Sequence, residues 1–275
     1  MTRLIQISDL HFGRDRPELV GPLTDAIRAA EPDLVLMAGD FVQRARDGQF
    51  AEARAFMDGL GLDWMAVPGN HDVPLFDIWS RLTDPYGAYA RHIAQDREPR
   101  EEIGDALILG LDTTDPHSHQ RGAVTPADIA RIAAEIAEHG ADRTVIVLAH
   151  HPFHQSAEVE KKLMTGAPDA LAAWAEAGPH MVLTGHLHTW LVEPFVTRKG
   201  ARMTLQVHAG TGLSTRKRGE PNDFAILDLA GDRVDVTRMA EEDGTFAPLG
   251  TDGFRRSAGG WQRLSETIAE RGAAE

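Results

Sequence analysis

The sequence of 275 residues contains no cysteine. Disulfides and thiolate chemistry are therefore excluded, and any metal ion would be held by nitrogen and oxygen ligands. No run of about 18 apolar residues is present, so a membrane-spanning helix is not expected. The opening segment, residues 1–9, lacks the long apolar core of a signal peptide and leads directly into a candidate site residue, Asp9. We therefore expect a cytoplasmic protein.

Positive charge is also scarce. The chain has 28 lysines and arginines against 42 aspartates and glutamates, which gives a formal net charge of -14. Such a surface repels nucleic acid and anionic lipid at long range, so a nucleic-acid partner is not expected. A local positive site made by metal ions could still bind a small anionic substrate. Hydrophobic residues make up 42% of the chain and charged residues 25%, which is an ordinary globular composition.

Short apolar runs alternate with helical patterns, which predicts an α/β fold with helices outside a sheet. Several of the runs are continuously apolar, as is typical of strands buried on both faces. The expected strands are Leu4–Ser8, Leu34–Ala38, Trp64–Val67, Ala106–Leu111, Thr144–Ala149 and Met181–Thr184. The expected helices are Pro22–Ala30, Gln49–Leu60, Ala167–Ala177 and one that begins at Thr125-Pro126, a cap followed by a first-turn proline.

After Trp190 the pattern changes to consecutive strands separated by turn residues. These strands are Leu191–Val196, Arg202–His208, Phe224–Leu229 and Arg233–Thr237, with turns at Lys199-Gly200, Pro221-Asn222 and Gly231-Asp232. They predict a second, mostly antiparallel sheet packed on the first. Because no low-complexity linker interrupts the chain, we expect one domain over residues 1–240. Residues 241–275 are expected to form a C-terminal extension that is partly helical, over Trp261–Glu270, or frayed.

Metal-ligand side chains stand at the ends of the expected strands. In chain order they form Asp9-Leu10-His11, Gly39-Asp40, Gly69-Asn70-His71-Asp72, His150-His151-Pro152 and Gly185-His186-Leu187-His188. In α/β sheets ligands bind outside the carboxyl ends of the strands, so residues far apart in sequence can meet on one rim. Together and in this order, the motifs indicate a hydrolase with two metal ions, which can neutralise a phosphate ester.

These five motifs resemble those of the calcineurin-like metallophosphoesterase family, and within it the bacterial class III cyclic-nucleotide and glycerophosphodiester phosphodiesterases. The resemblance covers roughly residues 3–188 by motif and implies a two-sheet αββα sandwich. It also implies two divalent or mixed-valence transition metals, for which this set of nitrogen and oxygen ligands favours Mn, Fe or Zn. By resemblance, one metal is held by Asp9, His11, Asp40 and His188, and the other by Asp40, Asn70, His150 and His186.

The resemblance further implies hydrolysis of a P–O bond in a small phosphodiester by metal-bound hydroxide. The substrate would be a cyclic nucleotide, a glycerophosphodiester or a phospholipid head group. Asn70 and His71 would bind it, and His71 would protonate the leaving alkoxide while Asp72 orients His71 or raises its pKa. A phosphomonoesterase and a non-catalytic metal-binding scaffold remain as alternatives, and a homo-oligomer is compatible with the sequence.

Several polar residues near these motifs allow two interpretations. His151 and His154 could touch the site or belong to an ordinary loop, and the same holds for His117 and His119. The segment Leu213–Glu220, which contains Arg216 and Arg218, is a local basic cluster in an acidic chain. It could meet a second anionic group of the substrate or form a solvated hairpin turn.

Overall fold

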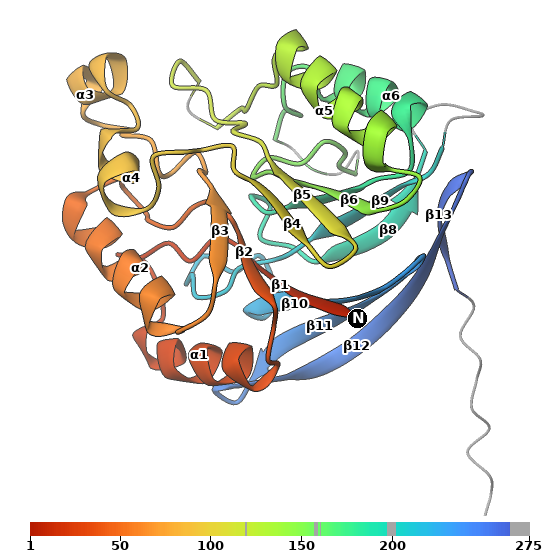
Figure 1. Ribbon diagram of the computed structural model, residues 1–275. Helices are drawn as coiled ribbons and strands as arrows, with labels where there is room; N and C mark the ends of the chain where they lie inside the picture. Colours follow the sequence, from red (N-terminus) through yellow and green to blue (C-terminus); the bar gives the residue numbers. More distant parts are fainter. Residues whose placement is uncertain (119, 157–158, 160, 197–201, 265–275) are drawn as a thin grey trace, which may run out of the picture.

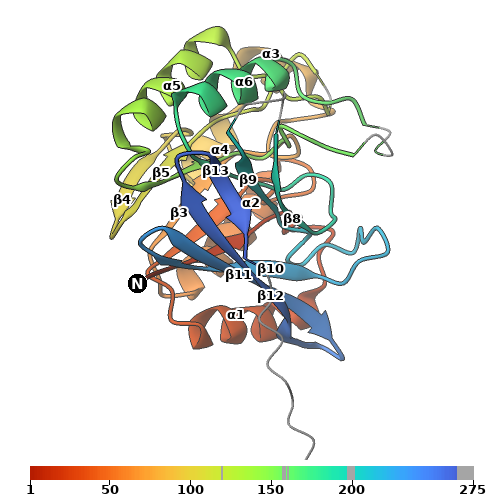
Figure 2. The same ribbon diagram turned by 90° about the vertical axis from the view of Figure 1, so that its right-hand side faces the viewer.

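The computed structural model describes residues 1–118, 120–156, 159, 161–196 and 202–264. Two sheets pack face to face and helices cover the outer face of each (Figure 1). In the view turned by 90°, α5 and α6 lie above the sheets and α1 lies below them (Figure 2). The predicted αββα sandwich is confirmed.

The first sheet has seven strands in the order β13-β12-β11-β10-β1-β2-β3. β1 runs parallel to β2, and β2 runs parallel to β3, whereas β1 pairs antiparallel with β10. The strands are β1 (Thr2–Ile7), β2 (Leu34–Ala38), β3 (Trp64–Val67), β10 (Asp223–Ala230), β11 (Arg233–Glu242), β12 (Thr245–Ser257) and β13 (Gly260–Arg263).

The second sheet has six strands in the order β4-β5-β6-β7-β9-β8. Its central strands β5, β6, β7 and β9 are parallel, and antiparallel strands close both edges. The strands are β4 (Arg100–Ile103), β5 (Ala106–Gly110), β6 (Thr144–Leu148), β7 (Met181–Thr184), β8 (Leu191–Phe195) and β9 (Thr204–His208).

The helices α1, α2, α5 and α6 connect parallel strands and lie on the outer faces of the sheets, whereas α3 and α4 lie in the connection from β3 in one sheet to β4 in the other. The helices are η1 (Pro17–Leu19), α1 (Val20–Ala29), α2 (Asp47–Gly59), α3 (Ile78–Thr83), α4 (Gly87–His92), α5 (Pro126–His139) and α6 (Ala167–Ala177). The predicted start of α5 is confirmed, because Thr125 and Asp128 form a reciprocal capping box in front of Pro126. None of the helices in the described ranges is long and apolar enough to cross a membrane.

Three apolar clusters hold the layers together, one between the sheets and one under each helical layer. Strand β2 illustrates how a continuously apolar strand serves two of them. Leu34 and Leu36 point into the cluster between the sheets, whereas Val35 and Met37 point toward α1 and α2. Successive side chains of a strand point to opposite faces of its sheet. Where one face packs on the other sheet and the opposite face packs on helices, the strand is therefore apolar on both faces.

The distribution of strands between the sheets differs from the expectation. The strands after Trp190 do not form a separate sheet. Instead, β8 and β9 complete one sheet and β10 to β13 complete the other. In the first sheet the parallel strands come from the first 190 residues and the antiparallel strands from the rest. In the second sheet β9 joins the parallel strands and β8 closes one edge as an antiparallel strand. The sequence pattern identifies strands and their burial, but it does not determine which neighbour each strand takes.

The C-terminal region also differs from the expectation. The boundary expected at residue 240 falls inside β11, and β12 and β13 extend the same sheet. Trp261 does not begin a helix but lies in β13, where its side chain is fully buried between the sheets. Its backbone N–H donates to the carbonyl oxygen of Met203 at 2.9 Å. Gly260, with φ +97°, turns the chain back against β12. The rest of the expected helix and the turn at Lys199-Gly200 lie outside the described residues.

A buried histidine in the second sheet gives the fold a predicted pH dependence. His180 lies just before β7, between Gly178 O at 3.1 Å and Thr204 Oγ1 at 3.3 Å, and burial lowers its pKa to about 4. The unfolded chain binds a proton at His180 more readily between about pH 6.5 and 4, so the folded state loses stability as the pH falls through this window. We expect this residue to account for about 2 to 3 kcal/mol of the loss at about pH 4.5.

Urea unfolding at about pH 7 and pH 4.5, with chelator present throughout, measures this contribution. His180→Asn should lose less stability on acidification than the unchanged protein. His139→Asn, on the last turn of α5, removes a histidine near the surface and serves as the matched control. An identical loss in all three proteins would contradict the assignment to His180.

Candidate metal centre

The predicted ligands lie in loops that follow the carboxyl ends of strands from both sheets. They are Asp9 and His11 after β1, Asp40 after β2, Asn70 after β3, His150 after β6, and His186 and His188 after β7. Because β1, β2 and β3 belong to one sheet and β6 and β7 to the other, the loops meet where the two sheets face each other. The convergence predicted from the motifs is therefore present in the fold.

The backbone at this rim adopts an unusual conformation. Of the eight non-glycine residues with positive φ in the described ranges, five are predicted ligands, with φ between 53° and 75°. These are Asp9, His11, Asp40, His186 and His188. Non-glycine residues seldom occupy this left-handed region, and such strain concentrates at functional sites, where the surrounding structure holds it in place.

Asp9, His11 and His188 form the first group of converging donor atoms, and all three are buried. Asp9 Oδ1 lies 3.0 Å from His188 Nε2 and 3.5 Å from His11 Nε2. The two imidazole nitrogens, His11 Nε2 and His188 Nε2, are 3.1 Å apart. Asp9 Oδ1, His11 Nε2 and His188 Nε2 thus lie close enough together to bind a single metal ion.

His150, Asn70 and His186 form the second group. His150 Nε2 lies 3.3 Å from Asn70 Oδ1 and 3.2 Å from His186 Nδ1. The ring of His150 is fixed from behind, because its Nδ1 donates to the carbonyl oxygen of Ala38 at 2.8 Å. Nε2 of His150 is therefore the nitrogen that faces the group, as is usual for a histidine ligand held by a backbone carbonyl.

Asp40 stands between the two groups. Its Oδ2 lies 3.6 Å from His11 Nε2 and 3.4 Å from His150 Nε2, while its Oδ1 accepts the backbone N–H of His71 at 2.8 Å. A Cβ on Gly69 would lie only 2.2 Å from Asp40 Oδ1, so a glycine is needed for this approach. One carboxylate is thus in reach of both groups.

The geometry of the donor atoms fits metal ions. Metal bonds of about 2.0 to 2.2 Å place neighbouring ligand atoms roughly 3 to 3.5 Å apart. The separations in the two groups run from 3.0 to 3.6 Å. Without a bound cation, several of these close pairs would bring nitrogen and oxygen lone pairs together. Each group could therefore hold a cation, and Asp40 is in reach of both groups.

Both carboxylates of the centre remain ionised despite their burial. Burial by itself raises the pKa of a carboxyl, but the charge and hydrogen bond of His188 hold the pKa of Asp9 well below its usual range. The charges of His150 and His71 do the same for Asp40 against the same burial effect. Both groups can therefore act as anionic ligands.

Comparison with known proteins agrees with this geometry. The model of the calcineurin-like phosphoesterase family matches residues 2–190, a span that contains every predicted ligand. The chain belongs to this family. It is accordingly a metal-dependent hydrolase of phosphoric esters.

Two relatives and one solved structure are similar to this phosphoesterase. A probable cyclic nucleotide phosphodiesterase of Rhodopseudomonas palustris is 22% identical over 84% of this chain and 90% of its own. A glycerophosphodiester phosphodiesterase of Enterobacter lignolyticus is 26% identical, but the match spans only 54% of this chain and 56% of the relative. The crystal structure of a dimetal phosphatase from Danio rerio superposes with a TM-score of 0.64 over 90% of this chain and 98% of its own, at 14% identity, and supports the fold.

Asp72 of the phosphoesterase makes contacts other than those predicted. Its carboxylate accepts the backbone N–H groups of Asp40 at 2.9 Å, Gly69 at 2.8 Å and Val42 at 3.1 Å. His71 is not among these partners, although it is the neighbouring residue in the chain. Asp72 therefore ties the loops after β2 and β3 together and positions Asp40, which corrects the expectation that it orients His71.

His71 is held instead by residues from two other loops. Its Nδ1 lies 3.0 Å from the carbonyl oxygen of Gln43 and 3.2 Å from the Gln43 side chain. Its Nε2 lies 3.0 Å from Arg216 Nη1. Because the carbonyl of Gln43 can only accept, Nδ1 carries a proton and Nε2 is the nitrogen that faces the site.

The remaining histidines considered from sequence take different places. His151 is buried, with its Nδ1 2.9 Å from Thr113 Oγ1, and its ring lies beside that of His186. His154 is exposed and stacks on Phe195 with ring centroids 4.8 Å apart. His117 lies in a turn in which its N–H donates to Asp115. His119 lies outside the described residues.

The structure adds residues that no sequence motif marked. A polar hollow lies directly over the donor atoms, and Lys161, Gln120 and Arg216 line it together with the predicted site residues. Arg216 was one of the two basic residues whose role was left open. Lys161 and Gln120 come from polar loop sequence with no distinctive pattern, so position in the fold alone identifies them.

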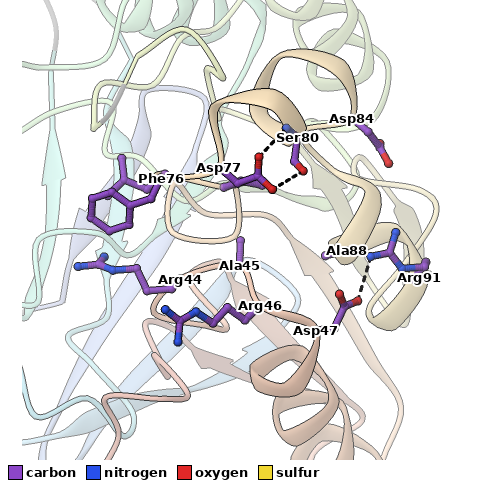
Figure 3. Close-up of a pocket in the computed structure, with 12 residues that line it drawn as sticks. Arg44, Ala45, Arg46, Asp47, Phe76, Asp77, Ser80, Asp84, Ala88 and Arg91 are labelled. Carbon is purple, nitrogen blue, oxygen red and sulfur yellow. Dashed lines mark hydrogen bonds and ion pairs between the residues drawn. The ribbon is translucent and has the colours of Figure 1, made fainter.

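A separate cavity of about 340 Å³ lies beside the loop of His71. Figure 3 shows Arg44 near Phe76 on one side of this cavity and Arg91 directed at Asp47 on the other. The Arg44 guanidinium lies 5.1 Å from the centroid of the Phe76 ring, and Arg91 pairs with Asp47 at 2.9 Å. The cavity is lined by apolar, basic and acidic side chains and shares no lining residue with the hollow over the donor atoms.

Proposed function

We propose that the protein is a dinuclear-metal phosphodiesterase that hydrolyses a P–O bond of a small phosphodiester. The observation that carries this proposal is the position of Asp40 between two groups of buried donor atoms. The names of the two relatives, a cyclic nucleotide and a glycerophosphodiester phosphodiesterase, favour a diester over a monoester. A cytoplasmic location and a homo-oligomeric state stay predictions from the sequence.

The donor atoms suggest how the metals would be divided. Asp9, His11, Asp40 and His188 would hold one ion, and Asp40, Asn70, His150 and His186 the other. With nitrogen and oxygen donors and no thiolate, we propose Mn, Fe or Zn as the metals. When bound, the pair supplies Lewis acidity toward a phosphoryl oxygen and lowers the pKa of a water molecule.

His71 is the side chain that we assign to proton transfer. Its Nδ1–H is held by Gln43 O, so a second proton can reside only at Nε2, beside the hollow over the donor atoms. Arg216 Nη1 can donate to Nε2 only while that nitrogen is unprotonated, so this contact must open before Nε2 carries the proton that it gives to the leaving alkoxide. Asn70 lines the same hollow and would contact the phosphoryl group with His71.

Turnover of two chromogenic esters tests the proposed function. Protein stripped by chelator and then loaded with Mn should cleave bis(p-nitrophenyl) phosphate faster than p-nitrophenyl phosphate. Faster cleavage of the monoester would make the protein a phosphomonoesterase. No cleavage of either ester, with two metals confirmed by elemental analysis, would favour a metal-binding scaffold.

Removal of metal should also destabilise the fold, because the ligands come from loops of both sheets. A ligand that binds only the folded chain at a hundred times its Kd stabilises it by about 2.7 kcal/mol. For a chain of this size that corresponds to a rise in melting temperature of roughly 5 to 10 °C. Calorimetry with and without chelator measures the shift, and superimposable melting curves would count against a filled site.

A further inference from the structure

Two cationic side chains line the hollow over the donor atoms without belonging to the predicted ligand set. Lys161 Nζ donates to the carbonyl oxygen of His186 at 3.1 Å and lies 3.2 Å from His186 Nε2. Arg216 Nη1 lies 3.0 Å from His71 Nε2. Both side chains are half-buried and line the hollow together with Asp40. One cation is thus placed beside His186 and the other beside His71.

About half of the lysines and arginines in the described ranges pair with a carboxylate, and these two cations do not. Within the described ranges neither Lys161 nor Arg216 has a carboxylate within salt-bridge distance. Lys217, the next residue after Arg216, turns away from the hollow and pairs with Glu241 at 3.2 Å. The basic cluster at residues 213–220 therefore divides, with Arg216 at the site and Lys217 on the outer surface.

Arg218 adds a third positive charge near this place. Arg218 itself is exposed. Burial lowers the pKa of Lys161 most, and the positive charge of Arg218 is the next largest cause. Burial also lowers the pKa of Arg216 most, and the charge of Arg218 adds to that effect. The charges of Asp9 and Asp40 offset part of this repulsion, because they raise the pKa of both Lys161 and Arg216. In a chain with a net charge of -14, such a concentration of positive charge indicates a ligand contact.

The charges near the hollow indicate what kind of anion would fit. Asp9 and Asp40 bring two negative charges and Lys161 and Arg216 bring two positive charges, so these four side chains together carry no net charge. The positive charge of two bound metal ions would then be neutralised only by water-derived anions and by the substrate. A simple phosphodiester contributes a single negative charge. A phosphodiester with a second anionic group would neutralise more of this positive charge than a phosphodiester with neutral substituents.

We propose that Lys161 and Arg216 form an anion-binding pair that selects a phosphodiester carrying a second anionic group. This inference rests on the proposed function and narrows its substrate class. The guanidinium of Arg216 and the ammonium of Lys161 can each make a charge-assisted hydrogen bond to such a group. Of the two interpretations of the basic cluster, ligand contact applies to Arg216 and a solvated surface applies to Lys217.

Two esters that share one leaving group test the pair. One is p-nitrophenyl butyl phosphate, and the other is p-nitrophenyl 3-sulfopropyl phosphate, whose sulfonate is a weak metal ligand. The Mn-loaded protein should prefer the sulfonate in kcat/KM by about tenfold, as expected for one hydrogen bond between charged groups. In Lys161→Gln this ratio should fall toward one, whereas Lys217→Gln should keep the preference. An equal kcat/KM for both esters in the unchanged protein would overturn the inference and leave the proposed function intact.

Calorimetric binding of two non-hydrolysable anions separates this inference from the proposed function. If neither ester is cleaved, the Mn-loaded protein is titrated with propylphosphonate and with 3-sulfopropylphosphonate. Binding of the sulfonate about tenfold tighter, with the difference lost in Lys161→Gln, would support the anion-binding pair although the proposed hydrolysis had failed. Equal Kd values for the two anions would overturn the pair as well.

Discussion

Replacing Asp40 by asparagine is expected to lower turnover of a phosphodiester by about 10³-fold or more and to reduce the metal content of the protein. Asp40 is the only carboxylate among the described residues that lies within 3.6 Å of both His11 Nε2 and His150 Nε2. An asparagine keeps the size of the side chain but removes the negative charge. Both ions would then lose an anionic ligand at the same time.

Elemental analysis and turnover of bis(p-nitrophenyl) phosphate, measured on the same preparations, check this expectation. Asp228→Asn is a matched control, because Asp228 pairs with Arg3 on β1 but lies outside the metal centre. The control should keep its metal and its activity. Unchanged metal content in Asp40→Asn would show that Asp40 does not connect the two ions.

Replacing His71 by alanine is expected to lower turnover by about 10² to 10⁴-fold while the metal content stays the same. His71 lies beside the donor atoms, with ring centroids of His71 and His11 4.8 Å apart, yet its Nδ1 is occupied by Gln43. Loss of the ring removes the proposed proton donor and leaves the ligands in place. His139→Ala removes a distant histidine and should leave turnover unchanged.

The choice of leaving group distinguishes proton transfer from simple binding. A p-nitrophenolate leaves without help, whereas an alkoxide needs a proton. The deficit of His71→Ala should therefore be larger for a glycerophosphodiester than for bis(p-nitrophenyl) phosphate. Equal deficits for the two substrates would assign His71 to binding of the phosphoryl group and remove its role as an acid.

Much of the fold could be predicted from the sequence, because burial leaves a clear pattern. Strands such as β2 and β6 are buried at every position and largely apolar, and Thr125-Pro126 marks the start of α5. The loops of the metal centre could be found for a related reason. They place aspartate, asparagine or histidine, in three of the five motifs together with glycine, directly after buried strands, which few other structural requirements explain.

Other elements were missed because their sequence carries no such pattern. β4 reads Arg-Glu-Glu-Ile and is largely exposed at a sheet edge. β12 contains two glycines and a proline, is mostly exposed, and is a strand because it pairs with β11. In both cases the neighbouring strand, and not the local composition, determines the conformation.

The roles of single polar residues were the hardest to predict. The sequence places Asp72 next to His71, but adjacent side chains of a loop can point in different directions. In the fold, the Asp72 carboxylate accepts the backbone N–H groups of Asp40 and Val42 in the loop after β2 and of Gly69 in its own turn. Lys161 reaches the metal centre from a loop distant in sequence, so only tertiary structure brings it beside His186.

The pairing of β1 has a consequence for folding during synthesis on the ribosome. β1 is synthesised before the other described strands, yet it lies inside the first sheet, where its antiparallel neighbour is β10 with Thr2 opposite Leu229. Contacts between such distant residues form slowly. Until residue 230 has left the exit tunnel, β1 has one open edge, to which strands of other chains can add. Nascent chains that stop short of β10 should therefore depend on chaperones, and the metal centre, whose first ligands follow β1, should be completed only after synthesis has passed that point.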